Sequence, residues 1–196
     1  MVIGLTGNYG MGKSYVLSVF RELGAIVLDS DDIVDQLLHD KGVICKIKKI
    51  LGNCIENEDG TLDKAKIAKI IFNNSKMRIK LEVLLHPLAF ARVEASLQNI
   101  KGKRRLAIVE VPLLFEGDYQ GRFNRTITVF TTQKAAIERL MRAGVSRSNA
   151  MKRLKVQLPP RTKKKLADYT IDNNGTKQRT RSQVIKIYKK LSEEMV

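Results

Sequence analysis

The chain has 196 residues, of which 43% are hydrophobic, and this suits one compact domain whose core needs no metal ion or disulfide bond to stabilise it. No apolar run approaches the roughly 18 residues of a membrane-spanning helix, so we expect no membrane association. The formal net charge of +16 favours polyanionic partners, namely nucleic acid, anionic lipid or phosphorylated small molecules.

Five short apolar runs predict the strands of a parallel sheet. Each is rich in branched residues and is bounded by polar residues, glycine or proline. The runs are residues 2–5, 25–28, 106–111, 126–130 and 169–171. The first has no basic segment before it and is too short for a signal peptide, which predicts a cytoplasmic protein.

Helical periodicity appears between these runs, at residues 13–23, 133–142 and 179–191. Strands that alternate with helices predict an α/β fold with a doubly wound, five-stranded parallel sheet.

One basic region stands out at residues 142–165, with nine Lys or Arg and no Asp or Glu. This region is either a solvated face or a positive lid or binding surface.

The region from residue 33 to 102 breaks the alternation, and we interpret it as a mostly helical insertion between the second and third strands. Residues 43–51 place their apolar side chains on one helical face, and Ile67, Ile70 and Ile71 mark another helix. EDGTLD, residues 58–63, predicts a turn, and Pro87 predicts the start of a further helix. The two cysteines, Cys45 and Cys54, match no ligand spacing and are expected to be reduced thiols.

The stretch GNYGMGKS, residues 7–14, fits the phosphate-loop pattern G-x-x-x-x-G-K-[ST] between a predicted strand and a predicted helix. Glycines let backbone N–H groups turn toward phosphate oxygens, and the following helix adds its positive N-terminal end. Lys13 would reach the β- and γ-phosphates, and the Ser14 hydroxyl would bind Mg²⁺. The loop therefore predicts a nucleoside triphosphate site.

The fate of the γ-phosphate separates a GTPase from a kinase. A GTPase would carry D-x-x-G directly after the third strand and an N/T-K-x-D motif that reads the base. Asp118 begins a D-x-x-G match, but it lies several residues beyond the third strand. The nearest lysine candidate, TTQKAA at residues 131–136, has no aspartate after it, which disfavours a GTPase.

A kinase needs an acceptor hydroxyl in line with the γ-phosphate and a group that accepts its proton. The second strand ends in VLDSDD, at the carboxyl edge where such sheets bind ligands. Asp29 and Asp31 alternate along the extended chain and therefore point to opposite sides. Asp31 is the candidate for this role. The alternative is that Asp31 or, better, Asp32 caps a helix that begins near Ile33.

Seven features follow one another along almost the whole chain: GLTGNYGMGKS at 4–14, DSD at 29–31, DGTLD at 59–63, LLHPL at 84–88, VPLLFE at 111–116, the pair Arg153 and Gln157, and ADYTIDNNG at 167–175. In this order and spacing they resemble the dephospho-coenzyme A kinases, relatives of the nucleoside monophosphate kinases. The resemblance implies transfer of the ATP γ-phosphate to the ribose 3′-hydroxyl of dephospho-coenzyme A, the last step of coenzyme A synthesis.

The resemblance also implies residue roles. Asp31 would be the catalytic base, with Lys13 and Arg139 at the transferred phosphate. The residues expected to bind ATP are Gly7, Asn8, Tyr9, Gly10, Met11, Gly12, Lys13, Ser14, Tyr15, Arg142, Asn173 and Gly175, with Ser14 as the ligand of Mg²⁺. The residues expected to bind the acceptor are Asp31, His86, Pro112, Leu113 and Glu116.

Three parts are expected from the same resemblance. Residues 1–32, 103–138 and 167–196 would form the nucleotide-binding core, 33–102 the acceptor-binding insertion, and 139–166 a lid that closes over ATP and excludes water. Pro87 disfavours a helical conformation at His86, so we expect a helix break that exposes His86, or else an ordinary histidine at a helix end. Glu116 is either a residue of the cleft or an exposed loop acid.

The chain departs from the family pattern at two places. Tyr15 stands where a threonine is usual, and RLMRAGVS is one residue shorter than the usual lid stretch, so that Arg142 follows Arg139 by three residues instead of four.

Two other functions stay open. The first is a kinase of a nucleoside or another small alcohol. The second is a nucleic-acid-binding ATPase that uses the basic region, although that region lacks the aromatic residues on which bases stack. The expected partners are ATP, Mg²⁺ and dephospho-coenzyme A, with no nucleic acid and no membrane, for a monomer or a small homo-oligomer.

Overall fold

The computed structural model describes residues 1–98 and 105–195. The chain divides into two compact units, one formed by Met1–Asp29 with Gly102–Val196 and the other by Ser30–Lys101. No helix among the described residues is long and apolar enough to cross a membrane. The predicted separate lid at 139–166 stays a prediction.

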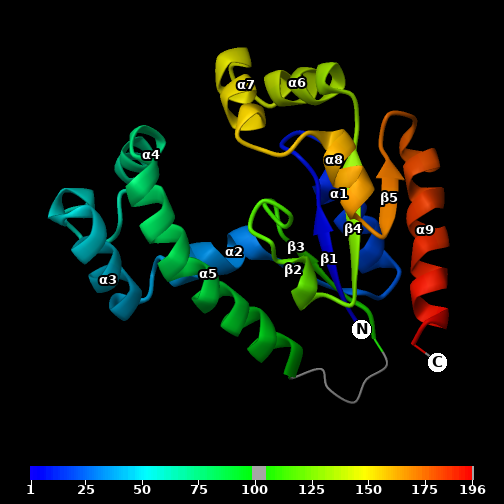
Figure 1. The fold of residues 1–196 in the computed structure, drawn as a ribbon, viewed down its shortest axis with the longest axis horizontal. Helices are drawn as coiled ribbons and strands as arrows, with labels where there is room; N and C mark the ends of the chain where they lie inside the picture. The colour runs from blue at the N-terminus through cyan, green and yellow to red at the C-terminus, as the bar shows by residue number, and fades with distance from the viewer. Residues whose placement is uncertain (99–104, 196) are drawn as a thin grey trace. The chain divides into compact units, whose positions relative to one another are not determined.

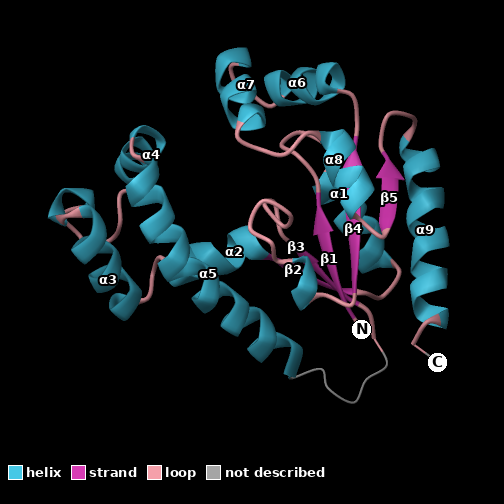
Figure 2. Cartoon of the chain, viewed as in Figure 1, coloured by secondary structure: helices cyan, strands magenta, loops and turns pink. Residues whose placement is uncertain are grey.

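The first unit is built on a five-stranded parallel sheet with the strand order β2-β3-β1-β4-β5. The strands are β1 Val2–Thr6, β2 Ile26–Asp29, β3 Ala107–Glu110, β4 Arg125–Phe130 and β5 Tyr169–Asp172 (Figure 2). Every predicted strand is confirmed to within one residue at each end. The strand order reverses about β1, and the carboxyl end of a strand at such a point is where open α/β sheets bind ligands.

Five α-helices and a short 3₁₀ helix at Gln120–Arg122 accompany this sheet in the described part of the first unit (Figure 1). The α-helices are α1 Lys13–Glu22, α6 Gln133–Arg142, α7 Arg147–Lys155, α8 Pro160–Leu166 and α9 Lys177–Glu193. Helices α1 and α9 pack together and bury Phe20, Val184 and Leu191 in one core with the strands. Helix α8 packs against β4, and α6 packs against α7. The three helices predicted around the sheet are confirmed.

The second unit is helical, as the sequence predicts. Its helices are α2 Ser30–Leu37, α3 Lys41–Leu51, α4 Lys64–Asn73 and α5 Ser75–Gln98, with a short 3₁₀ helix at Asn53–Ile55. The long helix α5 packs against α2, α3 and α4. The predicted turn at 58–63 is confirmed, and its last residue, Asp63, caps α4 by accepting hydrogen bonds from two backbone N–H groups. Cys45 and Cys54 are exposed, free thiols.

The prediction that Pro87 begins a helix is wrong, because Pro87 lies inside α5. The helix continues through it because Leu81 and Leu85 before the proline and Ala89 and Val93 after it form one buried stripe with a spacing of four residues. This packing outweighs the lost backbone hydrogen bond and the steric clash, which together cost about 3 kcal/mol. The expected helix break at His86 is therefore absent from the described helix.

The predicted start of α2 is also wrong. The helix begins at Ser30, directly after β2, so Asp31 and Asp32 lie in its first turn and not in an extended or capping position. Carboxylates are stabilised in the first turn of a helix by its positive end, which makes the SDD sequence suitable for this position. Asp29 and Asp31 therefore do not alternate along one extended segment.

Replacing Pro87 by alanine is expected to raise the free energy of unfolding by about 1–3 kcal/mol, because the new N–H group can donate to the carbonyl of Val83. The denaturant midpoint of the purified variant measures this. The matched control is Pro160→Ala, because Pro160 begins α8 and its missing N–H has no partner in the helix. A Pro87→Ala midpoint at or below that of the parent chain would contradict this account of α5.

Candidate active site

The phosphate loop, residues 7–14, joins the carboxyl end of β1 to α1. Gly10 and Gly12 have φ values of 78° and 86°, in the left-handed region where glycine is favoured. A Cβ atom on Gly12 would lie 2.2 Å from Nδ2 of Asn173, so no larger residue fits there. Gly12 also precedes α1 without a side-chain cap, which leaves the first N–H groups of the helix available to an anion.

Lys13 forms an ion pair at the base of this loop. Its Nζ lies 3.4 Å from Oε1 of Glu110, and the two side chains are only 12% and 9% exposed. Glu110 is the last residue of β3 and lies opposite Leu5 of β1. We did not predict Glu110 as a site residue, although an acid within the apolar run AIVEV is a signal for a buried functional carboxylate.

The Ser14 hydroxyl is exposed in the first turn of α1, next to Lys13. No group of three or more His, Cys, Asp or Glu side chains within residues 1–98 and 105–195 could hold a metal ion by itself. Mg²⁺ that is bound with a nucleotide needs no such group, because it keeps several waters and takes phosphate oxygens and one or two protein ligands. A hydroxyl at this place therefore fits the predicted Mg²⁺.

Asn173 supports the inner side of the loop. Its Nδ2 donates to the carbonyl oxygen of Met11 at 2.9 Å, and its Oδ1 accepts from Oγ1 of Thr180 on α9 at 2.9 Å. The Asn173 backbone N–H donates to Phe130 at the end of β4. The side chain thus fixes the loop against two other elements, while the predicted contact of Asn173 with ATP stays a prediction.

Arg139 of α6 reaches the same side of the loop. Its Nη2 donates to the backbone oxygen of Asn173 at 2.8 Å. Its Nη1 is buried and has no hydrogen-bond partner, and it would lie 3.3 Å from a Cβ on Gly12. A phosphate oxygen held by the loop would satisfy this guanidinium. Arg142, by contrast, is exposed at the end of α6.

The segment between α7 and α8 borders the outer side of the loop. Asn8 Nδ2 donates to the carbonyl oxygen of Leu158, and the Tyr9 backbone N–H donates to Oε1 of Gln157, both at 2.9 Å. The Arg153 guanidinium stacks 4.7 Å from the centre of the Tyr9 ring. The predicted pair Arg153 and Gln157 therefore lies at the phosphate loop.

Glu116 and Lys163 form a buried ion pair beside this segment. Lys163 is fully buried, and its Nζ lies 2.9 Å from Oε1 of Glu116. Burial lowers the pKa of Lys163, and the hydrogen bond and charge of Glu116 oppose that effect. Glu116 is only 15% exposed, so the alternative of an exposed loop acid is wrong. Its predicted contact with the acceptor stays a prediction.

Four other predicted site residues belong to this unit: Tyr15, Pro112, Leu113 and Gly175. The Tyr15 hydroxyl donates to the carbonyl oxygen of Lys177 at 3.0 Å and so ties α1 to α9. The carbonyl oxygen of Pro112 accepts from Oγ1 of Thr6, and Leu113 next to it is half-buried. Gly175 is exposed near the start of α9.

The helical unit holds the two other predicted residues. Asp31 is exposed in the first turn of α2. His86 is half-buried in α5, where burial lowers its pKa and the nearby charge of Glu82 opposes that shift. His86 is therefore neither an exposed residue at a helix break nor a helix-end residue.

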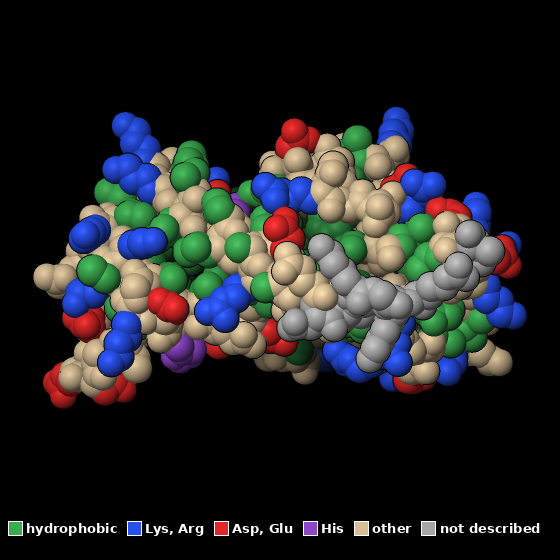
Figure 3. All heavy atoms as spheres, turned by 90° about the horizontal axis from the view of Figure 1, so that it is seen from below, with side chains coloured by type: hydrophobic (Ala, Val, Ile, Leu, Met, Phe, Trp, Pro, Cys, Tyr) green, Lys and Arg blue, Asp and Glu red, His purple; other side chains and the backbone are tan. Residues whose placement is uncertain are grey.

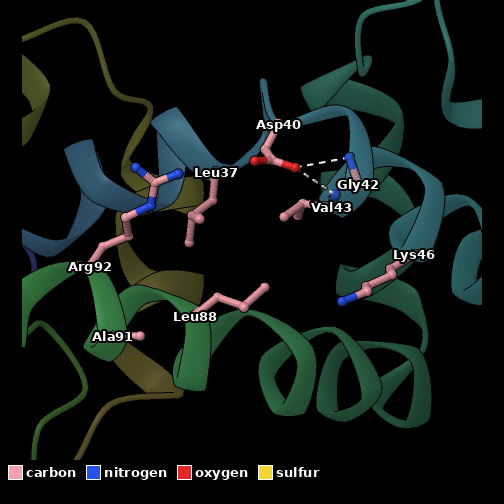
Figure 4. A pocket seen from close by; sticks show the side chains of 8 residues that line it. All are labelled: Leu37, Asp40, Gly42, Val43, Lys46, Leu88, Ala91 and Arg92. Carbon is pink, nitrogen blue, oxygen red and sulfur yellow. Dashed lines mark hydrogen bonds between the residues drawn. The ribbon is translucent and has the colours of Figure 1, made fainter. Parts of the chain in front are cut away.

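A pocket of about 320 Å³ lies within the helical unit, between α2, α3 and α5. Figure 4 shows Leu37, Val43 and Leu88 around its middle and Lys46 and Arg92 at opposite ends. The Asp40 carboxylate also lines the pocket, which therefore combines an apolar centre with two cationic groups and one acidic group.

Replacing Gly12 by alanine is expected to weaken ATP binding at least about tenfold and to destabilise the fold, because the methyl group meets Asn173 at a positive φ. Calorimetric titration with ATP and a denaturation curve measure both effects. Gly60→Ala is the control, since Gly60 also has a positive φ, 82°, but open space around it. Equal ATP affinity in the two variants would contradict the steric account.

Acidification is expected to destabilise the chain in part through His86. The pKa of His86 is lower in the folded than in the unfolded chain, so the unfolded chain binds its proton first as the pH falls through about 6.5. The stability that neutral His86 contributes at pH 7.5 is thus lost toward pH 5.5. Denaturant midpoints at both pH values should fall further for the parent chain than for His86→Gln, and equal losses would contradict this.

Comparisons with known proteins agree with this geometry. A family model described as dephospho-CoA kinase matches residues 1–179. The chain is 37% identical over 194 residues to a dephospho-CoA kinase of Aquifex aeolicus, which covers 98% of each chain. It is also similar to the crystal structure of TT1252 from Thermus thermophilus, with a TM-score of 0.87, 29% identity and coverage of 98% and 97%.

A dephospho-CoA kinase structure from Campylobacter jejuni shares the fold, with a TM-score of 0.74 at 23% identity over 100% of this chain and 98% of that one. The predicted fold class and the resemblance drawn from the motifs are both confirmed. The chain belongs to the dephospho-CoA kinase family.

Proposed function

We propose that this kinase transfers the γ-phosphate of ATP to the ribose 3′-hydroxyl of dephospho-coenzyme A and releases coenzyme A and ADP. The observation that supports this most directly is the phosphate loop, where backbone N–H groups, Lys13 and the unpartnered Nη1 of Arg139 converge. Such donors favour a triphosphate and the charge that develops on its γ-phosphate during transfer.

Lys13 and Arg139 both stabilise the negative charge of the transferred γ-phosphate, from two sides. Both cations are positioned before a ligand arrives, Lys13 by Glu110 and Arg139 by the Asn173 carbonyl. Mg²⁺, when bound at Ser14, neutralises charge on the β- and γ-phosphates. Preorganised cations of this kind stabilise the transition state without rearranging during the reaction.

Asp31 is the proposed base that accepts the proton of the 3′-hydroxyl. Covalent connectivity keeps its Cα within about 7 Å of the Asp29 Cα. Asp29 lies opposite Glu110 in the sheet register, and Glu110 pairs with Lys13. Asp31 lies in the first turn of α2, and a carboxylate is one of the groups that act as a general base.

The helical unit is proposed to hold the acceptor. Its pocket offers Leu37, Val43 and Leu88 to an apolar arm and Lys46 and Arg92 to negative charge (Figure 4). Dephospho-coenzyme A combines these two features. On the face drawn in Figure 3, Lys and Arg side chains are scattered among apolar and acidic ones.

The test of the function is ADP release from ATP and Mg²⁺ with dephospho-coenzyme A and with a panel of nucleosides, nucleoside monophosphates and RNA. We expect release with dephospho-coenzyme A alone, with coenzyme A identified by mass. ADP release with another small alcohol would mean that the chain is a kinase with a different acceptor. ADP release with RNA, or without any acceptor, would favour an ATPase.

The Asp31→Asn variant is expected to lower kcat by about 10²–10⁴, the usual contribution of a general base, and to leave ATP affinity nearly unchanged. Steady-state kinetics and ATP titration measure the two effects. Asp32→Asn is the matched control, because Asp32 is also exposed in the first turn of α2. Equal kcat values for the two variants would remove Asp31 from the role of base.

A further inference from the structure

Three segments that are distant in sequence meet along the outer edge of the phosphate loop. The first is residues 6–9 of the strand end and loop, the second is residues 112–116 after β3, and the third is residues 157–163 around the start of α8. Asn8 and Tyr9 bond to residues 158 and 157, and the Leu158 N–H donates to Oε1 of Glu116 at 2.8 Å.

Lys163 connects two of these segments from inside the protein. Its buried ammonium pairs with Glu116 and also donates to the Pro112 carbonyl oxygen at 3.1 Å. The same carbonyl oxygen accepts the hydroxyl of Thr6, the last residue of β1, at 3.1 Å. Direct hydrogen bonds and an ion pair therefore lead from Thr6 through the Pro112 carbonyl oxygen and Lys163 to Glu116. Glu116 in turn binds the backbone of Leu158, which contacts the phosphate loop.

The energetics of this pair point to a role other than stability. A buried ion pair contributes little net stability, since the loss of hydration offsets most of the attraction between its charges. Here Oε2 of Glu116 is buried and has no hydrogen-bond partner, which adds to the unfavourable terms. Besides burial, the charge of Lys13 also acts to lower the pKa of Lys163. Replacing a buried ion pair by apolar residues of similar volume is often neutral or stabilising.

We propose that Lys163 is a positioning residue for ATP binding, which acts through Glu116 and residues 157–158 to hold the outer edge of the phosphate loop in its binding conformation. Asn8 and Tyr9 directly precede Gly10, where the loop turns with a positive φ. Without this support the loop must be ordered when ATP binds, and that ordering weakens affinity. The inference deepens the proposed function at the same site.

The first variant is Lys163→Met, which keeps an unbranched side chain, one heavy atom shorter, and removes its charge. We expect the dissociation constant for ATP, measured without any acceptor, and the KM for ATP to rise about tenfold. We expect kcat to change less than about threefold, because Lys163 is buried and does not reach the reacting atoms. Lys163→Met also leaves the buried Glu116 carboxylate without a cationic partner, so the melting temperature of the variant should fall.

The double variant Lys163→Met/Glu116→Gln separates positioning from stability. It removes both charges, so the melting temperature should recover most of the loss while the ATP dissociation constant stays raised. Recovery of both quantities would show a merely structural pair and overturn the proposal. A changed KM for the acceptor with normal ATP affinity would also overturn it, and would make Glu116 an acceptor contact instead.

A second variant tests the other end of the connection. Gln157→Leu removes the acceptor of the Tyr9 N–H without burying a charge, so it should raise the ATP dissociation constant in the same direction and lower the melting temperature less than Lys163→Met does. Lys186→Met, at an exposed lysine of α9, is the control and should match the parent chain. Normal ATP affinity in Gln157→Leu and Lys163→Met would overturn the proposal, whichever acceptor the kinase uses.

Discussion

The phosphate loop is held by residues outside it as well as by its own turn, in which the Met11 N–H donates to the Asn8 carbonyl oxygen, and the rest of the site depends on this support. Its glycines give the loop the turns it needs but contribute no side-chain packing. The support comes from hydrogen bonds to residues outside the loop, among which the Asn173 side chain is buried. Asn173 holds the inner side at Met11, and Gln157 with Leu158 holds the outer side at Asn8 and Tyr9. These contacts join residues about 150 positions apart, so the loop takes its shape only when the sheet is complete.

The cationic side chains around the loop are also held by specific partners. Lys13 and Lys163 each face a carboxylate, Glu110 and Glu116, so neither cation is buried without a partner. Arg139 differs, because one of its nitrogens bonds to a backbone carbonyl while the other has no partner. A bound phosphate would supply the missing acceptor. Without a ligand, two buried side-chain atoms among the described residues lack a hydrogen-bond partner: Nη1 of Arg139, where the transferred phosphate is expected, and Oε2 of Glu116.

Sequence reasoning predicted the parts of this arrangement that are local. Branched apolar runs marked every strand, and the glycine and lysine spacing marked the phosphate loop. It missed Glu110 and the inward orientation of Lys163, because three consecutive lysines at 163–165 look alike in sequence and only the Glu116 contact, 47 positions away, distinguishes the first. The prediction that Pro87 begins a helix failed for the opposite reason. A strong local signal was overridden by the buried stripe that runs along α5 on both sides of it.

The most direct test of the account follows the γ-phosphate itself. A limiting amount of ATP that carries a labelled γ-phosphate is mixed with an excess of enzyme, Mg²⁺ and dephospho-coenzyme A, and the products of the single turnover are separated. We predict that the label appears in coenzyme A, that a 3′-specific phosphatase releases it, and that ADP forms in equal amount. Label in free phosphate, or at another hydroxyl of the acceptor, would contradict the proposed transfer.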